Sequence, residues 1–110
     1  MTIDFADFDR VDVRVGTIVD VEDLPRARRP SYRLTVDFGP DLGTRRTSAQ
    51  VTTYEPDELR GMQVVAVVNF EPKNIAGFMS EVLVLGLPDA DGEVALLSPT
   101  RAVPDGGRMF

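Results

Sequence analysis

Hydrophobic and polar residues alternate along Val11–Val21. Val13 and Val15 stand between polar neighbours, and this spacing of two predicts one long strand that buries a single face. Gly16 and the off-phase Ile18 interrupt the alternation. We therefore expect a bulge at this point, because a small sheet that closes on itself must bend its longest strand.

A second strand is predicted over Ser31–Phe38, after a loop at Leu24–Ser31 that is rich in proline and arginine. Its apolar side chains occupy alternate positions, so they should lie on one inner face; they are Tyr32, Leu34, Val36 and Phe38. A turn at Gly39–Gly43 leads to a third, weakly alternating strand at Thr44–Val51. A short helix should follow it, beginning near Pro56 and closed by Gly61.

The second half of the chain predicts a central strand and a hairpin. Gln63–Val68 is almost uninterrupted apolar sequence, which is typical of a strand covered on both faces. Asn69–Phe78 is expected to be a polar loop, and Met79–Leu87 another strand. Asp89–Gly92 has the residues of a tight turn that leads into a last strand at Glu93–Leu97.

The ends of the chain are predicted to be less regular. Residues 1–10 should contain a short helix with Thr2 as a possible N-cap, and residues 99–110 form a largely irregular extension. The order of elements, with one helix between the third and fourth strands, fits a five- to six-stranded Greek-key barrel of the OB-fold type. We expect a single all-β domain with short helices over residues 1–110.

Charge is distributed unevenly along the chain. The total of 18 acidic and 12 basic residues gives a net charge of −6, but Arg26 to Arg46 reverses the balance with six arginines and two acids. If this segment folds onto one surface, it makes a basic patch on an acidic body, as in proteins that bind nucleic acid. Arginines that merely flank solvated turns are the alternative, and charge alone does not separate the two.

Few residues of this sequence could act as catalytic groups. With no cysteine and no histidine, the chain lacks a thiolate and the commonest proton shuttle and metal ligand. Ser48 and Ser80 have no base partner, so we predict no enzyme, no cofactor and no metal site.

No stretch approaches the roughly 20 apolar residues of a membrane span, and the first residues do not resemble a secretory signal. The expected location is the cytoplasm.

The remaining polar residues predict a binding surface. It combines the arginine-rich loop and strand, Ser48 and Gln50, and the loop NFEPKNIAGF that begins at Asn69. Barrels of this type bind single strands through cations near phosphates and rings beneath bases. Phe78 is either such a ring or part of the core, and Asn69 either contacts a ligand or starts a turn. Lys73, the one lysine of the chain, favours a functional role.

Five segments resemble a known family: VDVRVGTIVDVEDLP, SYRLTVDFG, RTSAQVT, VVAVVNFEPKNIAGFMSEVLVLG and LLSPTRAVPDGGRMF. The chain is similar over nearly its whole length to the CsaA family, a branch of the tRNA-binding domains found attached to methionyl-tRNA synthetases. The resemblance implies an OB-fold homodimer with tRNA-binding ancestry, and a role of this branch as a chaperone linked to protein export.

The matching motifs imply a set of residues at an RNA surface. Together with the arginines added for their charge, and with residues of the long motif, this set is Arg33, Arg45, Arg46, Ser48, Gln50, Asn69, Lys73, Asn74, Gly77, Phe78 and Ser80. The chain has Val82 and Leu83 where the wider group usually has glycine and methionine. This apolar run, Val82, Leu83, Val84 and Leu85, is expected to lie at a subunit interface.

Two functions remain open at this point. The first is an RNA-binding module that recognises the folded shape of tRNA, or of another structured RNA, with phosphate contacts supplying most of the affinity. The second is a chaperone whose dimer offers apolar pockets to unfolded or export-precursor proteins.

Overall fold

The computed structural model describes all 110 residues and contains nine strands and three short helices. In chain order these elements are α1 (Phe5–Asp9), β1 (Val13–Asp23), β2 (Tyr32–Asp37), α2 (Gly39–Leu42), β3 (Thr44–Ala49), α3 (Pro56–Leu59), β4 (Gln63–Val67), β5 (Lys73–Ile75), β6 (Phe78–Ser80), β7 (Leu83–Val84), β8 (Gly86–Pro88) and β9 (Val94–Leu96). None of the helices is long and apolar enough to span a membrane.

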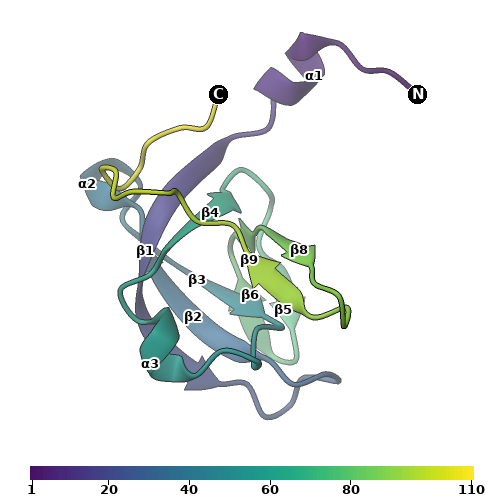
Figure 1. Cartoon of the computed structure of the whole chain (residues 1–110), viewed down its shortest axis with the longest axis vertical. Helices are drawn as coiled ribbons and strands as arrows, with labels where there is room; N and C mark the ends of the chain where they lie inside the picture. Colours follow the sequence, from purple (N-terminus) through teal and green to yellow (C-terminus); the bar gives the residue numbers. More distant parts are fainter.

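Five strands form one antiparallel sheet in the order β3-β2-β1-β4-β7. This order places the fourth strand beside the first, which is the Greek-key arrangement. The sheet closes where β3 meets the segment before β7, because the Glu81 amide donates to the Arg46 carbonyl at 2.8 Å. The Thr47 hydroxyl adds a bond to the Val82 carbonyl at 2.7 Å. The predicted OB-type barrel is therefore confirmed (Figure 1).

The barrel interior is filled by a cluster of 12 buried residues from β1, β2, β4, α3 and the segments next to these elements. The inner face predicted for the second strand is correct, since all four of its apolar side chains are buried. Below them, α3 closes one end of the barrel and inserts Leu59, which is fully buried. Gly61 follows this helix with a φ of 89°, so it ends the helix as predicted.

The bulge of β1 lies one residue later than the sequence predicts. Ile18 pairs with Val36 and Asp20 pairs with Thr35, so Val19 is the extra residue, and its side chain is exposed. Gly16 has a different role, because a Cβ there would lie 2.7 Å from the side chains of Phe38 and Val36. It permits close packing instead of a bend.

Two predictions for the segment after β4 are wrong. The stretch Asn69–Phe78 is not only a loop, because β5 and β6 form a hairpin there. The strand predicted over Met79–Leu87 is divided among β6, β7 and β8. The division occurs because its apolar residues serve different surfaces: Val82 turns into the core while Leu83 remains exposed. The hairpin turn predicted before β9 is present.

The two ends of the chain lie at the same end of the barrel (Figure 1). The N-terminal helix begins after Asp4 rather than Thr2, since Asp7 accepts a hydrogen bond from the Asp4 amide. The C-terminal tail is irregular as predicted, yet its backbone pairs with β1: Val15 donates to Gly107 at 3.0 Å and accepts from Gly106 at 2.8 Å. The tail therefore covers the edge that β1 exposes beyond β2.

Candidate nucleic-acid interface

A basic groove runs between the β1–β2 loop and the β5–β6 hairpin. Its volume is about 480 Å³, and its lining residues are Arg26, Ala27, Arg28, Arg29, Ser31, Gln50, Asn74, Ile75 and Ala76. A smaller hollow next to it brings Arg26 together with Arg33 and Phe78. In OB-folds the loop between the first two strands and the face of the second and third strands form the usual ligand surface. The groove lies at this surface.

The polar face of β2 and β3 continues the groove. Arg33 lies opposite Ser48 and Thr35 lies opposite Arg46, so these side chains share one face of the sheet. Phe78 of β6 packs onto this face. The guanidinium carbon of Arg46 lies 4.6 Å from the centre of its ring, and that of Arg33 lies 5.8 Å away.

Phe78 is only 7% exposed, so its ring offers no free face to a base. The structure decides the alternative that the sequence left open in favour of packing. The ring instead holds two guanidinium groups by cation–π contact, which limits their motion and keeps them on one surface. Phe78 is thus a support for the cations of the face.

The arginines of this face have no carboxylate partner. All ion pairs of the structure involve Arg14, Arg60 or Arg108, and none involves Lys73 or an arginine between Arg26 and Arg46. Acids outnumber bases 18 to 12 in the chain, so carboxylates are plentiful elsewhere. The guanidinium groups of the face are therefore not held in ion pairs and are free to bind an anionic ligand.

Arg45 does not join this group. It lies opposite Val36, whose side chain is fully buried, and its Nε donates to the Leu42 carbonyl at 3.3 Å. Because consecutive side chains of a strand point to opposite faces, Arg45 and Arg46 cannot both contact the same ligand surface. The sequence predicted that Arg45 and Arg46 lie on one RNA surface because both are charged, but the structure places them on opposite sides of β3.

Three polar residues of the predicted set hold the hairpin in place. Ser80 accepts a hydrogen bond from the Ser48 amide at 3.2 Å and lies 2.9 Å from the Thr47 hydroxyl. Asn74 accepts from the Gly77 amide at 2.9 Å and so stabilises the turn between β5 and β6. These bonds fix the wall of the groove, and Gln50 and Asn74 also line it.

Asn69 uses its side chain at a different place. Its Oδ1 accepts from the Asp12 amide at 3.0 Å, and its Nδ2 donates to the Arg10 carbonyl at 2.8 Å. These two bonds connect the end of β4 to the link between α1 and β1. In this structure both polar groups of Asn69 are occupied within the chain.

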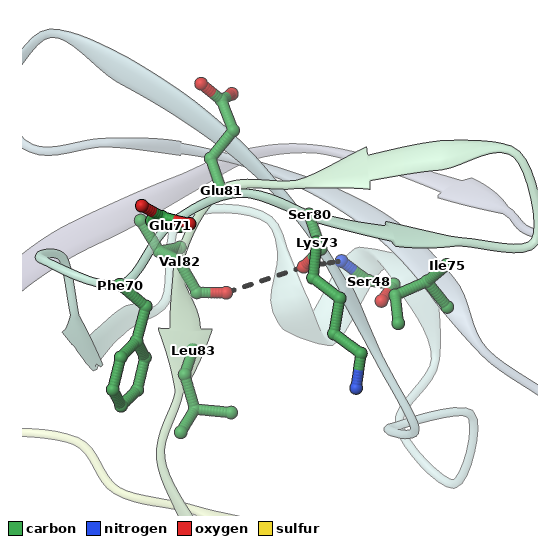
Figure 2. Close-up of a pocket in the computed structure, with 9 residues that line it drawn as sticks. All are labelled: Ser48, Phe70, Glu71, Lys73, Ile75, Ser80, Glu81, Val82 and Leu83. Carbon is green, nitrogen blue, oxygen red and sulfur yellow. Dashed lines mark hydrogen bonds between the residues drawn. The ribbon is translucent and has the colours of Figure 1, made fainter.

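A second hollow, of about 470 Å³, lies beyond the hairpin (Figure 2). It is lined by Ser48, Phe70, Glu71, Lys73, Ile75, Ser80, Glu81, Val82 and Leu83. Phe70 is 56% exposed, so it is the free aromatic ring of this region. The sequence interpretation did not select it, although a ring within a stretch of charged and polar residues was a usable signal. The three arginines of the β1–β2 loop belonged to the predicted binding surface, but they were not among its individual site residues.

The four residues predicted at a subunit interface have separate positions. Val82 is 5% exposed and belongs to the core of its own barrel, so it is not free for a partner. Val84 and Leu85 are half-buried, and the Leu85 amide donates to the Val65 carbonyl. Only Leu83, at 49%, has a largely exposed side chain.

The structure contains no cluster of three or more acidic residues that could hold a metal ion.

A closed OB-type barrel with a group of arginines that form no ion pairs is typical of a domain that binds nucleic acid. Residues 13–108 match the family model described as "Putative tRNA binding domain". The chain belongs to this family, and within it to the CsaA type.

Solved structures and curated relatives agree with this assignment. The CsaA chaperone protein from Picrophilus torridus is 46% identical with a TM-score of 0.93, covering 99% of this chain and 100% of that one. Chaperone CsaA from Bacillus anthracis is 48% identical with a TM-score of 0.92 and full coverage of both chains. A methionine–tRNA ligase of Porphyromonas gingivalis is 35% identical over 108 residues, which are 97% of this chain but only 15% of the ligase.

Proposed function

We propose that this chain binds tRNA, or another folded RNA, through one basic face, which consists of the β1–β2 loop arginines with Arg33 and Arg46, and that it catalyses no reaction itself. The observation that carries the proposal is the convergence of guanidinium groups without carboxylate partners, from the β1–β2 loop and from β2 and β3. The similarity to a domain of methionine–tRNA ligases favours tRNA over other anions.

Phosphate contacts are the expected source of affinity. The loop arginines line a groove between the loop and the hairpin, and Arg33 lines the hollow next to it. Arg46 adds its charge beside them, over the ring of Phe78. This arrangement suits a sugar–phosphate backbone. Each contact with a phosphate releases a counterion, so binding should weaken steeply as salt rises. A negative total charge does not prevent this, because the Debye length of about 8 Å at physiological salt confines the effect of distant acids.

Arg46 and Arg45 provide a matched pair for the test. Arg46→Ala should weaken tRNA binding and reduce the slope of log K against log salt by roughly 0.7–0.9, the value for one lost phosphate contact. Arg45→Ala removes the same charge from the other side of the strand and should change both quantities much less. Affinity measured by filter binding or anisotropy over a range of salt concentrations gives both values.

Other results would reject the proposal. Wild-type protein that shows no tRNA binding at low salt, or binding that does not respond to salt, is incompatible with a phosphate-binding face. Equal effects of the two substitutions would mean that RNA binding depends on the net charge of the protein and not on which side of β3 carries the arginine.

We also infer that the chain forms a homodimer through the α1 segment. The helix has five residues, none of them buried, and it stands away from the barrel (Figure 1). Ile3 and Phe5 are 68% and 75% exposed. Because helices this short are unstable alone in water, packing against a second copy would supply the apolar contact that α1 lacks.

Sedimentation measures this directly. Wild type should have twice the 12.1 kDa of one chain, and a double substitution Ile3→Ser with Phe5→Ser should yield monomers. Val19→Ser, which replaces an apolar side chain 49% exposed on β1, is the control and should remain dimeric. A monomeric wild type would exclude the homodimer.

A chaperone role is the second candidate, and an apolar groove of about 520 Å³ supports it. Val15, Val65, Leu97 and Val103 line this groove under the C-terminal tail, and the two CsaA structures are described as chaperones. An unfolded segment or an export precursor could bind there, in the cytoplasm where tRNA is also found. Suppression of aggregation by wild type and by Arg46→Ala alike, but not by Val103→Glu, would support it. No suppression by wild type would exclude it.

A further inference from the structure

The hollow beyond the hairpin borders the basic groove. Ile75 lines both of them, so they meet at β5. A strand of RNA whose phosphates follow the loop arginines would therefore pass Ile75 and reach the hollow. Whatever occupies the hollow can belong to the same ligand.

The walls of the hollow differ in their chemistry. Phe70 and Leu83 form an exposed apolar side, and the side chain of Lys73 extends along the same side of the ribbon (Figure 2). The carboxylate of Glu81 points to the other side in the same view, and Glu71 lies at the edge of the hollow. The Lys73 ammonium has no carboxylate within ion-pairing distance. Its charge is thus free for an anion.

Ser48 adds a hydrogen-bonding group to the hollow. Its backbone amide donates to Ser80 and its carbonyl accepts from Thr47, while its hydroxyl makes no hydrogen bond within the chain. The ring of Phe70 likewise has no aromatic or cationic partner, in contrast to Phe78. An aromatic face, a cation and a hydroxyl are thus all unoccupied around one space.

We propose that this hollow holds one unpaired nucleotide of the bound RNA. Its base stacks on Phe70, its phosphate contacts Lys73, and a polar edge of the base hydrogen-bonds with the Ser48 hydroxyl. The inference rests on the proposed RNA binding and adds a preference for single-stranded segments. Bases of a double helix are stacked on one another and cannot insert, whereas those of loops and ends can. The hollow would thus direct the protein to an unpaired part of a folded RNA.

Substitution of Phe70 tests the stacking contact. Phe70→Ala should weaken binding of an unpaired RNA oligonucleotide by roughly 5- to 150-fold, the range for one stacked base. It should leave binding of a fully paired RNA of the same charge unchanged. Phe70→Tyr keeps the ring and should retain most of the affinity. Leu87→Ala, which removes a side chain 61% exposed on β8, is the control.

A fluorescence experiment gives an independent measure. The chain has no tryptophan, so Phe70→Trp introduces a single reporter in the hollow and Leu87→Trp a single reporter outside it. Unpaired RNA should quench the emission of the first variant and not the second, and paired RNA should quench neither. Thermal unfolding of each variant confirms that it is folded.

The outcomes separate this inference from the proposed function. If wild type binds RNA in a salt-dependent manner but Phe70→Ala binds unpaired RNA as well as wild type does, the nucleotide site is rejected and the basic face stands. Equal loss of paired and unpaired RNA also rejects the site, as does quenching of Phe70→Trp by an unfolded polypeptide but not by RNA. If wild type binds no RNA, the proposed function itself fails.

Discussion

The buried ring of Phe78 holds two arginines on the polar face of the barrel. Arg46 is stacked over it at 4.6 Å, and Arg33 lies at 5.8 Å. Such contacts contribute from about 0.5 to 2 kcal/mol, depending on how well they are desolvated. Their main effect here is to order two long side chains before a ligand arrives, so that less conformational freedom is lost on binding.

Tyr32 determines a pH dependence of stability. Burial raises the pKa of Tyr32 above its ordinary value of 10.0, and the nearby carboxylates of Glu55 and Asp23 raise it further. Its hydroxyl also donates to the Tyr54 carbonyl at 2.9 Å. As pH rises above the ordinary value, the unfolded chain loses this proton while the folded chain keeps it.

The free energy of unfolding should therefore fall as pH rises from about 9 to about 11, because the folded state binds more protons than the unfolded state there. Tyr32→Phe should lose about 1 kcal/mol at neutral pH with the hydrogen bond to Tyr54, and its stability should decline less steeply over the same range. Urea unfolding of both proteins across this range measures the difference. Parallel declines would show that other groups are responsible.

Among the elements, the β5–β6 hairpin lines both the basic groove and the hollow. Each of its strands has three residues, and Ile75 pairs with Phe78 across a two-residue turn. Ala76 and Gly77 in this turn have φ values of 53° and 83°, which is the type I′ geometry that matches the twist of the strands. Glycine adopts such a backbone freely, but alanine does not.

Ala76→Asn should stabilise the protein by roughly 0.5–1 kcal/mol, since asparagine tolerates the left-handed region and Asn-Gly is the preferred pair in this turn. The midpoint of urea unfolding should rise. Ala90→Asn is the matched control, because Ala90 lies in the β8–β9 turn without a positive φ. A gain of the same size in both variants would show that the backbone at Ala76 is not strained.

At the scale of the whole molecule, the sheet has two places where it would otherwise stay open. One lies between β3 and β7, where fully buried Thr47 bonds to the Val82 carbonyl. The other is the N-terminal half of β1, where the tail pairs in place of a strand. Arg14 supports the tail by donating to the Gly106 carbonyl at 3.0 Å. The tail thus protects an edge that could otherwise pair with another chain.

Deletion of residues 104–110 should lower the stability and cause self-association. It removes the backbone bonds to Val13 and Val15, and the bond from the Thr17 hydroxyl to Asp105 at 2.8 Å. Thermal unfolding and light scattering at increasing protein concentration measure the two effects. Deletion of fully exposed Phe110 alone is the control. A truncated protein that keeps its melting temperature and remains dispersed would show that the tail does not protect β1.

The basic face could be predicted in part. The charge reversal between Arg26 and Arg46 indicated a patch, and the structure gathers five of the six arginines near the groove and its adjoining strands. Arg45 could not be separated from Arg46 by charge, because the face that each occupies depends on the register of β3 with β2. The roles of Phe70 and Phe78 also depended on packing, which spacing along the chain does not reveal.

The sequence by itself determined the barrel, its inner face on β2 and its closing helix, because period-two burial and turn residues act over short distances along the chain. Only the tertiary structure decided which residues of the site are free. Asn69, Asn74 and Ser80 are polar in the same way as Ser48, yet their side chains bond within the chain. Such partners come from segments remote in sequence or from a turn whose backbone the fold sets, so local patterns do not contain them.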